Sequence, residues 1–134
     1  MTLHHLDLAD FLLVAEDTLQ IEAGYLATMC DLGRADAALN VTSAEWAGEP
    51  LHAGLAEKGA ALLSRLVTMP PVPARATEVA LACLFELAGR NGYRWVDRAG
   101  DAQALSERIR SVTPTGSSDV SALARWIADH LEPA

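Results

Sequence analysis

Apolar residues recur at helical spacing along most of the chain, in segments separated by glycines, prolines and short polar runs. In the first segment, residues three and four positions apart are apolar, while acidic side chains lie on the opposite face. This pattern is typical of an amphipathic helix with one face in the core. The same spacing predicts helices over residues 7–20, 31–39, 51–68, 75–90, 101–112 and from 118 or 119 to 131.

The segment over 75–90 is apolar on nearly all sides, which predicts the central helix of the molecule. Asn91-Gly92 is expected to end it, because glycine adopts the left-handed conformation at a helix end at little cost. The last helix carries a stripe of apolar residues, all expected to be buried: Val120, Leu123, Ala124, Ile127, Ala128 and Leu131.

Polar and small residues mark the connections. Gly24 predicts a turn after the first helix, and Asp31 is a suitable N-cap for the second. Residues 40–50 have little periodicity and predict an exposed loop or a short hairpin, in which Trp46 is the only large apolar side chain. Residues 93–96 predict a short extended piece. The expected fold is therefore an all-α, single-domain bundle of about six helices over 1–134, with a short β-hairpin.

Composition supports one folded domain. The chain has 134 residues, 51% of them hydrophobic, which is enough for a single core. Cys30 and Cys83 lie inside apolar helical patterns and are expected to be buried, reduced thiols.

Charge and hydropathy narrow the set of partners. The formal net charge is −8, Lys58 is the only lysine, and no basic patch alternates with aromatic residues, so we expect no nucleic-acid partner. The N-terminal residues have no signal-peptide pattern, and no apolar run is long enough to span a bilayer. We therefore expect a cytoplasmic protein without a membrane partner.

The segment over 69–78 combines features that suggest a binding loop. Three prolines in four residues, Pro70, Pro71 and Pro73, exclude regular helix before the apolar segment begins. The helix start that follows offers free backbone amides to an anion, and Arg75 and Thr77 are placed to supplement them. This predicts an anion or ligand site at Ala74, Arg75, Ala76 and Thr77. The alternative is an ordinary helix start with a solvated Arg75.

The order of these features resembles the Fic/Doc family, specifically the short death-on-curing proteins of bacterial toxin–antitoxin systems. The resemblance covers nearly the whole chain, and Trp126 matches a common position in the closing helix. It is carried by Leu6-Asp7-Leu8-Ala9-Asp10-Phe11-Leu12-Leu13, Asp31-Leu32-Gly33-Arg34-Ala35-Asp36-Ala37-Ala38-Leu39, Glu57-Lys58-Gly59-Ala60-Ala61-Leu62-Leu63, the run from Ala80-Leu81 to Asn91-Gly92-Tyr93, and the segment 120–131. The resemblance implies a helical fold, an antitoxin partner, and a flap near Trp46 that docks a target segment.

The active loop of that family has the form His-Pro-Phe-x-Asp-Gly-Asn-Lys-Arg, and an ungapped register lays it on 70–78. The histidine that acts as general base falls on Pro70, and the acidic residue falls on Ala74. The asparagine falls on Ala76, the lysine on Thr77 and the phosphate-binding arginine on Glu78. A base is thus missing, and the reversed charge at Glu78 would repel a polyphosphate. The family's transfer reaction is therefore not expected.

Three hypotheses follow. The first is a degenerate Fic/Doc-like protein that acts by binding an antitoxin segment, a former target or a second copy of itself as a homodimer. The second is an enzyme that uses the scaffold for a small molecule, with Glu78 as acid or base if it is buried, assisted by Arg75 and Thr77. The third is a structural interaction domain without a ligand.

The remaining candidate groups predict little chemistry. Glu78 and Glu86 lie two helical turns apart, too far for joint action on one bond, so they are expected to be exposed or paired with arginine. Glu49 and His52 have a spacing used in metal sites, but Pro50 lies between them and no second pair supports them. We expect neither a metal nor a cofactor.

Overall fold

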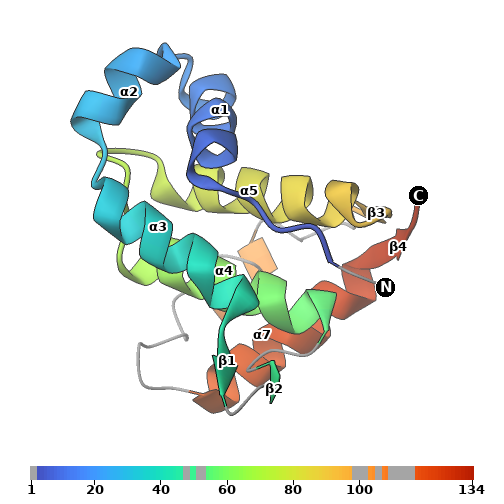
Figure 1. The fold of residues 1–134 in the computed structure, drawn as a ribbon. Helices are drawn as coiled ribbons and strands as arrows, with labels where there is room; N and C mark the ends of the chain where they lie inside the picture. The colour runs from blue at the N-terminus through green and yellow to red at the C-terminus, as the bar shows by residue number, and fades with distance from the viewer. Residues whose placement is uncertain (1–2, 47–48, 51–53, 98–102, 105–106, 109–116) are drawn as a thin grey trace.

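The computed structural model describes residues 3–46, 49–50, 54–97, 103–104, 107–108 and 117–134, with the backbone alone at 45–46, 49–50 and 117–120. Within these residues the chain forms six α-helices (Figure 1), which confirms the expected all-α fold. The helices are α1 (Leu8–Leu19), α2 (Ala23–Met29), α3 (Leu32–Asn40), α4 (Leu55–Thr68), α5 (Ala76–Arg90) and α7 (Ser117–His130). A single 3₁₀ turn, η1 (Val41–Ser43), follows α3.

The helices stack around one hydrophobic core. Helix α5 packs between α1 and α4, and α7 covers the other side of α4 (Figure 1). Every residue from 58 to 63 in α4 is buried, whereas Phe85 of α5 is 40% exposed. The helix over 75–90 therefore lies between two others, as a central helix would, but α4 is enclosed more fully because α5 and α7 pack on two sides of it. The largest fully buried side chains include Phe11, Leu26, Leu62, Leu63, Leu84, Leu87, Leu123 and Ile127.

Local capping explains where several helices begin and end. Asp7 and Asp10 form a reciprocal capping box at the start of α1. Asp31 caps α3 as expected, since its side chain accepts a hydrogen bond of 3.0 Å from the Arg34 amide. After α5, Gly92 has a φ of +81°, which confirms the predicted left-handed position.

Three expectations need correction. Gly24 does not form a turn but lies inside α2, whose first turn is capped by the Glu22 side chain. In the last helix Ala128 is exposed, because the buried stripe of α7 passes through Leu123, Ala124 and Ile127. Leu131, also expected in this stripe, is half-buried and follows the helix, which ends at His130. Helix α4 begins at Leu55, and residues 51–53 lie outside the described part. The predicted helix over 101–112 is described only at 103–104 and 107–108, which are helical.

Two short antiparallel pairs complete the fold. Strands β1 (Glu45–Trp46) and β2 (Glu49–Pro50) pair with each other, which confirms a hairpin between α3 and α4. Strand β3 (Tyr93–Trp95) confirms the predicted extended piece, and it pairs with β4 (Leu131–Pro133), a strand that the sequence pattern did not indicate. No described helix is long and apolar enough to cross a membrane.

The N-terminal segment from His4 and the C-terminal residue Ala134 both contact the turn after α5 (Figure 1). The buried Asn91 side chain accepts a hydrogen bond of 2.7 Å from the His4 amide. Its Nδ2 donates to the carbonyls of His4 at 2.9 Å and Leu87 at 2.7 Å. The Ala134 amide donates to the Gly92 carbonyl at 2.9 Å. Asn91 and Gly92 therefore anchor the first and last residues of the described chain together.

Candidate functional site

The proline loop between α4 and α5 is packed against α3. The Pro71 carbonyl accepts a hydrogen bond of 2.8 Å from the Asp31 amide, and the Pro70 carbonyl accepts one of 3.4 Å from the Arg34 guanidinium. Pro71 and Val72 are buried. The loop thus uses its carbonyls and its apolar side chain to close onto the protein.

The first backbone amides of α5 have no side-chain cap, but the cation beside them, Arg75, is already paired with other groups. No side chain caps the N-terminus of α5, and Arg75 precedes it in the left-handed region with a φ of +54°. The Arg75 guanidinium donates to the Thr18 carbonyl at 3.1 Å and forms an ion pair with Glu78. A cation at the last turn of α1 is favoured by the helix dipole. Ala74 is exposed, and Ala76 and Thr77 are half-buried.

Glu78 is an exposed, ionised side chain. The hydrogen bond from Arg75 lowers the pKa of Glu78, and the same bond raises the pKa of Arg75. Burial was the condition under which Glu78 would act as an acid or a base, and that condition is not met. At neutral pH Glu78 has no proton to donate, and its charge faces Arg75.

Among the other candidate groups, the side chains that the structure describes are placed for packing. Trp46 lies in β1, and its side chain is outside the described part. His130 is buried and stacked on Trp95, with ring centroids 4.8 Å apart. Cys83 is buried as expected, and burial raises the pKa of its thiol to about 12, so it is unreactive near neutral pH. Cys30 is only half-buried, so the expectation of a buried thiol is wrong there. Across the described residues, no group of three histidine, cysteine or acidic side chains is arranged to hold a metal ion.

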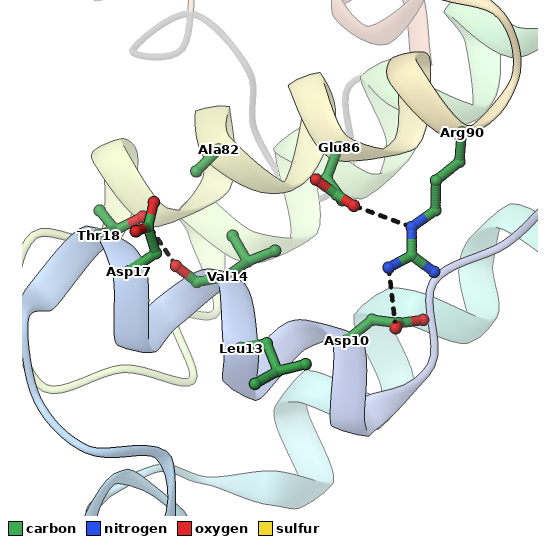
Figure 2. A pocket seen from close by; sticks show the side chains of 8 residues that line it. All are labelled: Asp10, Leu13, Val14, Asp17, Thr18, Ala82, Glu86 and Arg90. Atoms are coloured by element: carbon green, nitrogen blue, oxygen red, sulfur yellow. Dashed lines mark hydrogen bonds and ion pairs between the residues drawn. The ribbon is translucent and has the colours of Figure 1, made fainter.

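A cleft of about 310 Å³ lies between α1 and α5 (Figure 2). Val14 and Ala82 contribute its apolar lining, and Leu13 on its edge is 59% exposed. Charged side chains lie at both ends. The full lining is Asp10, Leu13, Val14, Asp17, Thr18, Ala82, Glu86 and Arg90.

The carboxylates at one end of this cleft are paired with an arginine, whereas among the described residues the carboxylate at the other end is not. Arg90 bridges Asp10 at 3.0 Å and Glu86 at 2.9 Å, which closes one end, as the dashed lines in Figure 2 show. The Asp7 amide, and then Arg90, lower the pKa of Asp10. At the other end, no ion pair within the described structure involves the Asp17 carboxylate. Three carboxylates and one guanidinium leave the cleft with two formal negative charges.

A second hollow of about 310 Å³ has the opposite charge balance. It lies between α3 and α4, beside the proline loop, and its lining includes Arg34, Arg65 and the exposed Met69. Asp31 is its one acidic lining residue. Arg75, Thr77 and Glu78 line neither of these two hollows.

Sequence reasoning found part of this arrangement. Glu86 was expected to be exposed or paired with arginine, and its ion pair with Arg90 confirms this. The cleft itself was missed, because Asp10 and Asp17 were placed on the solvent face of the first helix. The available signal was Leu13, an apolar residue between these acidic residues on the polar face.

Comparison of the chain with protein-family models, curated proteins and solved structures found no match.

Proposed function

We propose that this protein acts by binding another protein, on a Fic/Doc-like helical scaffold that has lost phosphoryl or nucleotidyl transfer. The main support for this proposal is that the loop over 69–78 packs against α3, where the Pro71 carbonyl accepts a hydrogen bond from the Asp31 amide. A transfer site at this position would need an open loop with a base and a phosphate-binding cation. Here Pro71 and Val72 are buried against the protein, and the only arginine in the loop is paired with Glu78.

The biological role in this proposal rests only on the resemblance of the sequence to the Fic/Doc family. In this proposal the protein belongs to the toxin family of a bacterial toxin–antitoxin system and is located in the cytoplasm. Its partner is an antitoxin segment, a former target or a second copy of the chain. The repurposed-enzyme hypothesis would need an open pocket converging on Glu78, and no observation on the described residues favours it.

Calorimetry with ATP, UTP and CDP-choline in the presence of Mg²⁺ tests the loss of the transfer site. We expect no saturable heat with the natural chain. The variant Glu78→Arg, which restores the sign of the family's charge, serves as the matched comparison. We expect this variant to give no saturable heat of nucleotide binding either, because the general base and the asparagine of the family's loop are still missing. Micromolar nucleotide binding by the natural chain would contradict the proposal.

Protein binding has its own test. The chain is co-expressed with the product of the neighbouring reading frame, and its mass is measured by sedimentation velocity with and without that product. A defined complex, or a homodimer of the chain alone, is the expected result. A monomer that binds neither itself nor the neighbouring product would count against the proposal.

A further inference from the structure

We infer that the cleft between α1 and α5 binds a basic amphipathic helix of a partner protein. An apolar side chain of that helix would pack against Leu13 and Ala82, and a lysine or arginine would reach Asp17. This inference rests on the proposed function, because it names the surface and the class of partner through which binding occurs.

The dimensions of the cleft fit a short stretch of helix. Its lining on α1 runs from Asp10 to Thr18, and on α5 from Ala82 to Arg90. Eight residues of helix span about 12 Å, or a little over two turns. A volume of about 310 Å³ is at the small end for ligand pockets, which suits one or two inserted side chains.

Part of the apolar surface of the cleft is exposed in the described structure. Leu13 is 59% exposed and lies between Asp10 and Asp17 on the same face of α1. On α5, Ala82 adds to the apolar lining of the cleft. Exposed apolar groups bordered by charges are typical of surfaces that bind other proteins.

Charge complementarity decides which helix fits. Arg90 already compensates Asp10 and Glu86, whereas the Asp17 carboxylate has no ion pair within the described structure. A cation of the partner can therefore pair with Asp17 without displacing Arg90. The net charge of −8 also attracts a basic partner and repels an acidic one during approach.

The test uses a fluorescein-labelled helical peptide of about 18 residues with a leucine stripe flanked by lysines, and a counterpart with glutamates in place of the lysines. We expect saturable binding of the basic peptide by anisotropy. In NMR spectra of the ¹⁵N-labelled protein, the shifted amides should lie within 10–18 and 82–90. The acidic peptide should leave these amides unshifted.

Matched variants assign the binding to the cleft. Asp17→Lys and Leu13→Ser should each weaken binding of the basic peptide by about tenfold. Asp36→Lys and Met29→Ser change an exposed acid and an exposed apolar residue outside the cleft, and should leave the affinity within about twofold. Thermal unfolding of each variant checks that the fold is intact, and Asp17→Asn provides a milder change at the same position.

Four outcomes would overturn the inference: no saturation with the basic peptide, equal binding of the acidic one, shifts centred elsewhere, or equal losses in the control variants. None of these alters the nucleotide calorimetry, which tests the proposed function separately. Nucleotide binding at micromolar affinity would overturn the loss of transfer chemistry and leave the peptide result standing.

Discussion

At the scale of single residues, Asp10 joins a helix cap to an interhelical contact. Its carboxylate accepts a hydrogen bond of 2.9 Å from the Asp7 amide and pairs with Arg90 of α5. Both interactions favour the ionised form, and they lower the pKa of Asp10. Since the side chain is only 18% exposed, solvent screens its interaction with Arg90 less than it would on an open surface.

The lowered pKa of Asp10 predicts a stability change in acid. Because the pKa is lower in the folded protein than in the unfolded chain, the stabilisation is complete above pH ~4 and is lost as the pH falls further, through the folded value. We expect Asp10→Asn to lower the free energy of unfolding by about 0.5–1 kcal/mol at neutral pH, with the difference from the natural chain vanishing in acid.

Urea unfolding of both proteins between neutral pH and pH ~3 measures this difference. Asp17→Asn is the control, because it removes a carboxylate of the same cleft that has no ion pair in the described structure. A difference for Asp10→Asn that stays constant down to the lowest pH would contradict the assigned role of the carboxylate.

At the scale of the helices, a single glycine sets how closely α4 and α5 pack. A Cβ atom added at Gly59 would lie 2.6 Å from the Cδ1 atom of the buried Leu84. Gly59→Ala gains about 1 kcal/mol of helix propensity but overpacks this contact, which costs about 1–3 kcal/mol. We expect a net loss of about 1 kcal/mol in the free energy of unfolding, measured by urea denaturation.

Gly89→Ala is the matched control for that variant. Gly89 lies in α5, and a Cβ atom there would meet no heavy atom within 4 Å. The same substitution should therefore stabilise the protein by about 0.5–1 kcal/mol. If both alanines stabilised the protein equally, the close approach of α4 and α5 at Gly59 would not be a constraint.

Elements governed by local interactions could be predicted from the sequence. The starts of α1 and α3 follow from Asp7 and Asp31, and the end of α5 follows from Gly92. Helix α2 was missed because it has seven residues and buries only Leu26, which gives no readable period.

The candidate site was less accessible to sequence reasoning. Periodicity shows which face of each helix is apolar but not which helices cross, so the cleft between α1 and α5 needed the structure. The prolines at 70, 71 and 73 predicted a loop without helix, whereas its closure depends on a hydrogen bond to Asp31 from a separate element. The position of Arg75, which pairs with Glu78, likewise depends on a contact with Thr18 of α1, a separate element.

At the scale of the whole molecule, Asn91 holds the N-terminal segment against the end of α5. Its buried side chain makes three hydrogen bonds, two to His4 and one to Leu87. Asn91→Ala leaves the part-buried His4 amide and two carbonyls without this partner, so we expect a loss of about 2 kcal/mol in the free energy of unfolding.

Thermal and urea unfolding measure that loss. Asn40→Ala is the control, because Asn40 is exposed and its side chain makes a long contact of 3.3 Å with Asp36. That variant should stay within about 0.5 kcal/mol of the natural chain. An Asn91→Ala protein as stable as the Asn40→Ala protein would mean that the contact with His4 is not needed to hold the N-terminal segment.

The same contact has a consequence for the order of folding. His4 and Asn91 are 87 positions apart in the chain, and closing a loop of that length costs more conformational entropy than forming a helical turn. Helices α4 and α5 are consecutive in the chain, so they can pack against each other before the loop between His4 and Asn91 closes. We therefore expect the Asn91 contact to form late in folding, so that Asn91→Ala accelerates unfolding and leaves the folding rate nearly unchanged in stopped-flow measurements. The lifetime of the folded protein, more than its rate of formation, is then expected to depend on Asn91.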